Sequence, residues 1–218
     1  GGAEELHPTH VAVFDGMYAA SLAHDRPGST PRPFDAARDG LVVGEGAGAV
    51  VLERWEHAVA RGADILGEVI GFGLCCDGTH VTAPSAVGMA SAMRLALESA
   101  SLPASAVEYV NAHATATEVG DIVESQATFA VLGGDVPVSS TKGHTGHTLG
   151  ACGAIELAFC VGAMREGCVP AARNLDGVHP ACAPLDYVQT TRAARPRVVM
   201  TNNFAFGGIN TSLLLQAP

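Results

Sequence analysis

Three short segments, each rich in polar residues or glycine, contain the side chains of this sequence that could do chemistry. The first contains His113, then Thr115 and Thr117, then Asp121 and Glu124. In extended chain the two threonine hydroxyls would face the same side, and on a helix the two carboxylates would share a face. This pattern fits a histidine with room for a substrate beside it. It fits equally well a core histidine followed by a helix that Thr117 caps.

The second segment, residues 139–153, places Lys142, His144 and His147 in a glycine-rich turn ahead of an expected helix. Cationic and donor groups near the positive end of a helix suit a negative charge that develops during a reaction. His144 and His147 could form a metal pair, but no third ligand stands at a suitable spacing, so we expect no metal. The residue order also differs from that of a Walker phosphate loop.

The third segment, residues 202–210, places Phe204 and Phe206 beside Gly207 in a turn between two expected strands. Loops rarely carry aromatic side chains that neither pack nor contact a ligand. The segment is therefore either the buried corner of a hairpin or part of a binding pocket.

The elements that must position these segments alternate between strands and helices, which predicts a layered α/β fold. Each segment begins where an expected strand ends, and the sites of such folds gather at the carboxyl ends of strands. The three segments are therefore expected to converge on one pocket. The expected strands cover residues 47–53, 68–74, 107–110, 136–140, 197–201 and 211–215, and the expected helices cover residues 55–61, 87–100, 119–132 and 149–165.

Composition excludes several classes of protein. Hydrophobic residues make up 48% of the chain and charged residues 16%, so a large core is available and disorder is not expected. The formal net charge of −10, with no Lys/Arg cluster, argues against a nucleic-acid partner. No apolar run could cross a membrane and the first residues do not resemble a secretion signal, so we expect a cytoplasmic protein. The six cysteines show no metal-site spacing and are expected to be free, mostly buried thiols.

In their order and spacing, the three segments resemble the His-Gly-Thr-Gly-Thr, Lys-x-x-x-Gly-His and Gly-Phe-Gly-Gly-x-Asn signatures of elongating ketosynthases, the β-ketoacyl-acyl-carrier-protein synthases. Residues 33–40, 44–48 and 171–176 look like the same family, so the resemblance covers essentially the whole chain. It implies a thiolase-like fold of two related halves stacked as five layers, αβαβα, which works as a dimer. Residues 1–62 would then be the tail of the N-terminal half, and residues 63–218 the C-terminal half.

The activity that the resemblance implies is the decarboxylative Claisen condensation of an acyl thioester with malonyl-acyl carrier protein, in fatty-acid or polyketide chain elongation. No cofactor is implied, because the substrates are carried on the phosphopantetheine of the acyl carrier protein. His113 and His147 would drive decarboxylation by donating hydrogen bonds to the enolate oxygen. Lys142 would support His113 through an ion-pair network with Glu124 and Glu156.

The resemblance also assigns residues to the acyl group and to the phosphopantetheine arm. The backbone N–H of Phe206 would form half of an oxyanion hole, and its ring would gate the acyl pocket. Thr115 and Thr117 would hydrogen-bond the arm. Further residues at the substrate would be Phe204 and Gly207, with Asp121 in support of the site.

Three residues depart from the family pattern. Ala114 and Ala205 stand at positions where the family usually has glycine, and Ile209 stands where threonine is usual. Ala114 is expected to crowd the backbone beside His113, and Ala205 to narrow the conformations open to the gating loop. These changes leave the implied reaction class unchanged.

The nucleophilic cysteine of the family lies upstream of the glycine pair with which this chain begins, and none of the six cysteines stands in an equivalent motif. We therefore expect the chain to be inactive alone and to need a complementary N-terminal half or a ketosynthase dimer mate. The alternative is a non-catalytic partner that resembles the chain-length-factor subunit of polyketide synthases. The presence of both His113 and His147 favours the enzyme, because a scaffolding subunit has no chemical need for them.

Overall fold

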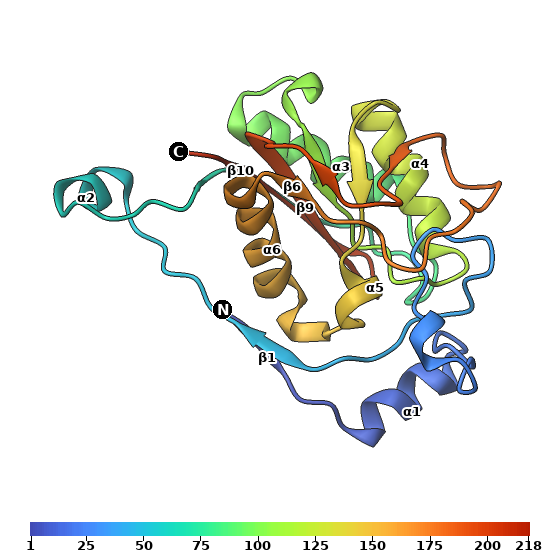
Figure 1. The fold of residues 1–218 in the computed structure, drawn as a ribbon. Coiled ribbons are helices and arrows are strands. Elements are labelled where there is room, and N and C mark those ends of the chain that lie inside the picture. The colour runs from blue at the N-terminus through green and yellow to red at the C-terminus, as the bar shows by residue number, and fades with distance from the viewer.

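The computed structural model describes residues 1–218 and places a six-stranded mixed sheet at the centre of the molecule, in the order β3-β10-β9-β4-β5-β7 (Figure 1). Strands β3, β10 and β9 are antiparallel neighbours, whereas β9, β4, β5 and β7 run parallel. The carboxyl ends of β4, β5 and β9 therefore open on the same edge of the sheet. The strands are β3 (Glu68–Cys76), β4 (Tyr109–Asn111), β5 (Pro137–Ser139), β7 (Asp186–Tyr187), β9 (Val198–Ala205) and β10 (Ile209–Gln216).

Helices cover both faces of this sheet (Figure 1). The helices α3 (Ala86–Ala100) and α4 (Gly120–Leu132) lie on one face, and α6 (Cys152–Glu166) lies on the other. Adjacent residues of a strand point to opposite faces of a sheet, and the hydrophobic core is divided in this way. The side of α3 and α4 receives Val110, Met200 and Leu214, and the side of α6 receives their neighbours Tyr109, Val199 and Leu215.

A small second sheet lies on the outer side of α6 (Figure 1). It consists of β1 (Gly2–Glu4) and β2 (Gly46–Gly48), which pair antiparallel. Glycine permits the close approach, because a Cβ atom at Gly48 would lie 2.9 Å from the carbonyl carbon of Ala154 in α6. The chain therefore builds four successive layers: helices, sheet, helix and sheet.

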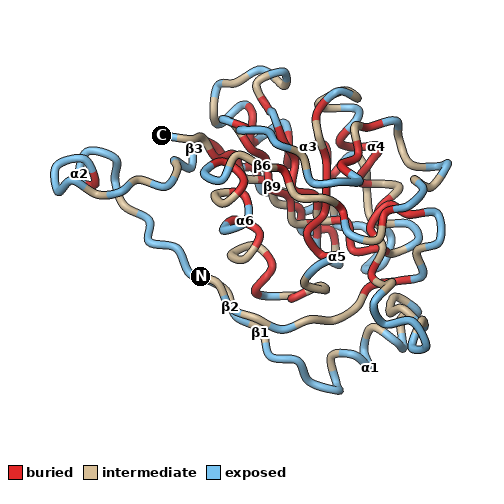
Figure 2. Tube along the Cα trace, in the orientation of Figure 1, coloured by how far each residue is buried: buried red, intermediate tan, exposed pale blue.

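Residues 49–67, which we call the arm, extend away from both sheets and include α2 (Trp55–Ala60) (Figure 1, Figure 2). The strand expected at residues 47–53 is wrong beyond Gly48, where β2 ends. Val51 is 89% exposed and Leu52 is 76% exposed. A strand persists where its backbone groups find partners, and no strand of this chain pairs with residues 49–53.

The other expected helices and strands are present, with different ends. The strand expected at residues 197–201 continues to Ala205, and the helix expected from residue 149 begins with a 3₁₀ turn, η3 (Leu149–Ala151). The remaining elements are too short to leave a periodic pattern in the sequence. They are α1 (Pro8–Gly16), α5 (Lys142–Thr145), β6 (Cys168–Val169), β8 (Arg192–Ala193), η1 (Pro27–Ser29) and η2 (Ala104–Ala106).

The six cysteines form no disulfide, but the expectation that most are buried is wrong. Only Cys152 and Cys160, both on α6, are buried, and Cys76 is exposed. Cys76 ends β3, and with Phe72 and Leu74 it lies on the face of that strand turned away from α3, which no helix of this chain covers. None of the helices combines the length and the apolar character that crossing a membrane requires.

Candidate active site

A cavity of about 710 Å³ opens at the edge of the sheet where β4, β5 and β9 end. His113 lines it from the first sequence segment, His147 from the second, and Phe206 from the third. The convergence expected from the strand ends is therefore present in the structure. Apolar walls of the cavity come from Phe14, Met17, Leu41 and Met89.

His147 is held as a neutral ring with its proton on Nε2. Its ring lies edge to face with that of His113, with ring centroids 5.2 Å apart and planes at 84°. The Nδ1 atom of His147 accepts a hydrogen bond from the backbone N–H of Leu149 at 3.3 Å and lies 3.1 Å from the Sγ atom of Cys152. Since Nδ1 is an acceptor, the ring proton is on Nε2. Burial, followed by the charge of Lys142, lowers the pKa of His147 to about 3.

His113 is neutral for the same reasons. Burial contributes most, and the neighbouring Lys142 and His147 add to it, so the pKa of His113 lies well below the ordinary value of a histidine. The Nδ1 atom of His113 is buried and has no hydrogen-bond partner. Two neutral imidazoles thus lie edge to face on the wall of one cavity. Two N–H donors that reach the same oxygen stabilise an oxyanion.

Glu124, on α4, fixes the chain segment that carries His113. Its two carboxylate oxygens accept the backbone N–H groups of His113 at 2.8 Å and of Ala114 at 2.6 Å. Burial raises the pKa of Glu124 to about 8, although the two N–H donors and Lys142 act in the opposite direction. Ala114 is buried and uses its N–H group in this bond, so alanine is accommodated beside the histidine.

Asp121 acts in the same way one turn earlier on α4. Its carboxylate accepts the backbone N–H groups of Phe34 at 2.7 Å and of Ala116 at 3.1 Å. Burial raises the pKa of Asp121 to about 6. Asp121 and Glu124 share one face of the helix, as their spacing predicts, and both bind backbone rather than substrate.

Lys142 lies behind the cavity and does not line it; its side chain is 1% exposed. Its Nζ atom donates to the carboxylate of Glu156 on α6, whose second oxygen accepts from the side-chain amide of Asn203 at 3.2 Å. The expected ion pair between Lys142 and Glu124 is not formed: Lys142 pairs with Glu156, while the two oxygens of Glu124 bind backbone. Burial alone would lower the pKa of Lys142, but the charge and hydrogen bond of Glu156, together with the charges of Cys152 and Glu124, outweigh it and raise that pKa, so Lys142 is a cation.

Thr115 and Thr117 face the same side of the chain, as their spacing predicts. Their hydroxyl oxygens are 3.1 Å apart, and both residues line the cavity. No side chain caps α4, so the alternative in which Thr117 is a helix cap is wrong. The cavity therefore presents a pair of adjacent hydroxyls beside His113.

The aromatic turn between β9 and β10 contributes both of its rings to the cavity wall. Phe204 is buried, and its ring centroid lies 6.3 Å from that of His113. Phe206 is 41% exposed, and its ring centroid lies 5.8 Å from that of Phe14 in α1. A buried hairpin corner describes Phe204, whereas Phe206 is open to the cavity.

Gly208, rather than Gly207, lines the cavity in this turn. The N–H group of Gly207 instead donates to the carbonyl oxygen of Val81 at 3.2 Å. Gly208 has φ of +80°, and a Cβ atom there would lie 2.0 Å from Oδ1 of Asp77. Only glycine fits at this position.

Ala116, rather than Ala205, is the alanine in a strained backbone conformation. Ala205 is the last residue of β9, pairs with Ile209 and is not at positive φ, so it is unstrained in this structure. Ala116 has φ of +68°, in the left-handed region that favours glycine. The His-Gly-Thr-Gly-Thr signature has glycine at this position too, so a comparison with the signature could have identified Ala116 as a departure. Sequence reasoning also missed Asn203, which lines the cavity and binds Glu156.

Comparison with protein families gives two matches. The model of the β-ketoacyl synthase C-terminal domain matches residues 66–176, and that of the N-terminal domain matches residues 1–58. A putative mitochondrial 3-oxoacyl-[acyl-carrier-protein] synthase of Schizosaccharomyces pombe is 43% identical over 229 residues, which cover 99% of this chain and 54% of that protein. The chain thus spans about half the length of the curated relatives it matches.

Solved structures agree with this comparison. A β-ketoacyl synthase from Burkholderia phymatum STM815 is 56% identical with a TM-score of 0.98, and the match covers 100% of this chain and 53% of that chain. A ketosynthase bound to a hexaketide, in complex with its type II polyketide acyl-carrier protein, is 32% identical with a TM-score of 0.95, covering 100% and 55%. These neighbours confirm the layered, thiolase-like α/β fold expected from the sequence. The model of the C-terminal domain matches about half of the residues of this chain, and the chain therefore belongs to the β-ketoacyl synthase family.

Proposed function

We propose that the protein containing this chain catalyses the decarboxylative Claisen condensation of an acyl thioester with malonyl-acyl carrier protein. The observation that carries the proposal is the pair of neutral imidazoles, His113 and His147, whose ring centroids are 5.2 Å apart. When the carbon–carbon bond to the carboxylate of the malonyl group breaks, carbon dioxide leaves. The electron pair of that bond stays on the thioester fragment, and its negative charge is held on the enolate oxygen. Two N–H donors in a buried site stabilise that oxygen.

The second step joins the two substrates. The enolate carbon attacks the carbonyl carbon of the acyl thioester, the new carbon–carbon bond forms, and the carbon–sulfur bond breaks with loss of a thiolate. The backbone N–H of Phe206 would donate to the carbonyl oxygen as it becomes negative. The contact of its ring with Phe14 supports a gate at the acyl pocket.

Lys142 acts through charge in this proposal rather than by proton transfer. It is a buried cation beside both rings, and it lowers the pKa of His113 and of His147. The cation therefore helps to keep the histidines neutral, so that each ring has one N–H donor and Lys142 supplies the positive charge beside them. Its pairing with Glu156 holds it behind the cavity.

The acyl carrier protein is the proposed partner at the mouth of the cavity. The adjacent hydroxyls of Thr115 and Thr117 match the amides of a phosphopantetheine arm, which offer both donors and acceptors. A structural neighbour of this chain is in complex with its acyl-carrier protein, which supports the assignment. Because the phosphopantetheine of the acyl carrier protein carries the substrates, the reaction proposed here uses no further cofactor and no metal.

The nucleophilic thiol is proposed to come from a complementary half or a ketosynthase mate. None of the six cysteines lines the cavity, and the matched relatives are about twice as long as this chain. On the face of β3 turned away from α3 the side chains are apolar and uncovered: Phe72 is 63% exposed and Leu74 is 60% exposed. Such a surface fits burial against a second domain. Free thiols fit a reducing compartment, for which we propose the cytoplasm.

A non-catalytic partner of the chain-length-factor type is the second candidate. Such a subunit would use the same fold, but it would have no use for two neutral donors in one cavity. The environment of His113 and His147, with its buried cation, therefore favours the enzyme.

A condensation assay on the longest protein that contains this chain tests the proposal. With acyl- and malonyl-carrier protein as substrates, His113→Ala and His147→Ala are each expected to lower turnover by about 100-fold or more. His144→Ala is the matched control: His144 is exposed, binds the carbonyl of Ala171 and lies outside the cavity, so turnover should be unchanged. Equal turnover in all three variants would contradict the proposal.

A further inference from the structure

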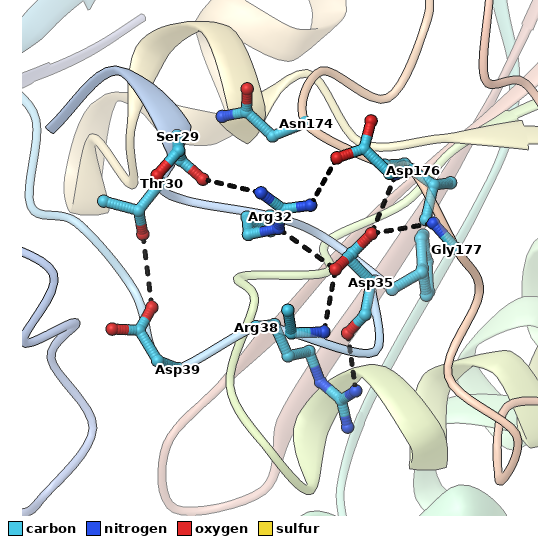
Figure 3. Close-up of polar contacts among 12 residues, drawn as sticks. Ser29, Thr30, Arg32, Asp35, Arg38, Asp39, Asn174, Asp176 and Gly177 are labelled. Carbon is cyan, nitrogen blue, oxygen red and sulfur yellow. Dashed lines mark hydrogen bonds and ion pairs between the residues drawn. The ribbon is translucent and has the colours of Figure 1, made fainter. Parts of the chain in front are cut away.

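A buried polar cluster in residues 32–40 takes no part in the chemistry proposed above, although the sequence of this stretch resembles the family (Figure 3). We propose that Arg38 in this cluster is a positioning residue. It holds the loop of residues 115–118 so that the hydroxyls of Thr115 and Thr117 stand in the cavity, and it thereby sets the affinity for the pantetheine arm. The inference rests on the proposed function and extends it to a residue outside the cavity.

Arg38 binds the loop through two consecutive carbonyl groups. Its Nε atom donates to the carbonyl oxygen of Thr117 at 3.0 Å, and its Nη2 atom donates to that of Glu118. The side chain is 2% exposed, so water does not compete for these bonds. A planar guanidinium can span two neighbouring carbonyls, whereas a lysine ammonium cannot reproduce that geometry.

The loop needs such support because its backbone is strained. Ala116 lies between the two threonines with φ of +68°, a conformation that an alanine does not adopt readily. The N–H group of Ala116 donates to Asp121, and its carbonyl accepts from the N–H group of Gly40 at 3.0 Å. Both backbone groups of Ala116 are thus hydrogen-bonded: the N–H group to Asp121, and the carbonyl group to Gly40, which follows Arg38 by two residues.

Arg38 has an anchor outside the loop, in addition to an ion pair at 3.9 Å with Asp121, which binds the loop at Ala116. Its Nη1 atom donates to the backbone carbonyl of Asp35 at 3.0 Å. The carboxylate of Asp35 in turn accepts from Arg32 at 3.0 Å and from the N–H groups of Asp176 at 2.8 Å and Gly177 at 2.9 Å (Figure 3). Arg38 therefore connects the loop at the cavity to a fixed point on another segment.

Arg32 offers a matched control in the same cluster. It too is an arginine, with its side chain 17% exposed, and it bonds both Asp35 and Asp176. It donates no hydrogen bond to residues 115–118, in contrast to Arg38. A merely structural role of the cluster would make Arg32→Lys and Arg38→Lys equivalent, whereas a positioning role would distinguish them.

Both variants would be made in the longest protein that contains this chain, with three readouts: thermal unfolding, the methyl resonances of Thr115 and Thr117, and KM and kcat for malonyl-acyl carrier protein. Arg38→Lys is expected to move both methyl resonances and to raise KM by about 10-fold, with kcat changed by less than about 2-fold. Arg32→Lys is expected to lower the unfolding temperature without either effect.

Unmoved methyl resonances in Arg38→Lys, or an equal rise of KM in both variants, would overturn the inference. The methyl readout does not depend on turnover, so it separates this inference from the proposed function. Moved resonances in a protein whose wild type has no condensation activity would refute the proposed function and leave Arg38 as the residue that positions the loop.

Discussion

The carboxyl ends of β4, β5 and β9, which carry the histidines and are called the edge below, differ from the arm at residues 49–67. Only the edge is enclosed by contacts with the rest of this chain. At the edge even a charged pair is enclosed, since the side chains of Lys142 and Glu156 are 1% and 3% exposed. In the arm, Val51 and Leu52 are 89% and 76% exposed, and no strand pairs with them. An apolar pattern thus predicts where a strand can form, whereas its partners decide whether it does.

Replacement of Lys142 by methionine tests the edge where it is most tightly enclosed. We expect the free energy of unfolding to fall by about 3–5 kcal/mol, because Glu156 would remain as a buried charge without its partner. The double variant Lys142→Met/Glu156→Met should recover much of the loss, since no buried charge then remains. Urea denaturation of the single and double variants measures both quantities. A single variant as stable as the wild type would show that this pair does not hold the edge.

Acid should weaken the edge through its neutral histidines. Below pH 6.5 the unfolded chain protonates His147, while the folded chain, with a pKa of about 3, does not. Stability is therefore lost as the pH falls from about 6.5 towards 3, by about 2 kcal/mol at pH 5.

Glu124 acts in the opposite sense over the same range. Its pKa in the folded chain is about 8, so its contribution to stability is present at low pH and is lost as the pH rises from about 4.5 to 8. The effect of His147 is therefore read as the difference between the urea midpoints of wild type and His147→Asn from pH 5 to 7.5. Parallel curves would refute the neutral state of His147.

Replacement of Ala116 by glycine tests the strained loop at the edge. Glycine adopts positive φ without penalty, which stabilises the folded state, and this effect exceeds the larger conformational entropy that glycine gives the unfolded chain. The free energy of unfolding should therefore rise by about 0.5–1 kcal/mol. Ala114→Gly is the control, and it should lower stability because Ala114 is not at positive φ. Thermal unfolding of the two variants measures the contrast. Destabilisation in both would show that position 116 is not strained.

The smallest effect is expected in the arm. Leu52→Gln should change the free energy of unfolding of this chain by less than about 0.5 kcal/mol, because the side chain is 76% exposed. Urea denaturation of the 218-residue chain provides the measurement. A loss above about 1 kcal/mol would mean that residues 49–67 pack against the rest of the chain.

The sequence predicts the site better than it predicts the contacts behind it. His113 and His147 follow strands of a parallel set, so their convergence could be expected from strand order alone. The partner of Lys142 could not, because it depends on how α6, which carries Glu156, packs against the segment that carries Lys142. The contact of Arg38 with Thr117 joins residues far apart in the sequence, and no periodic pattern reports such a contact.

The same limit applies to the fold. The helices at 87–100 and 119–132 are long enough to show a face, and the structure places them where the pattern does. The strand expected at 47–53 has an equally good pattern, yet it stops at Gly48 because nothing in this chain pairs with the rest. Periodicity reports which residues seek burial and carries no information on what covers them.

The ¹⁵N resonances of His113 and His147 report most directly whether two neutral imidazole donors stand at this edge of the sheet. At pH 7 both rings are expected to be neutral, with the proton of His147 on Nε2, and His147 should not titrate above about pH 4. A charged ring at pH 7, or a proton on Nδ1 of His147, would contradict the pair of neutral N–H donors on which the account rests.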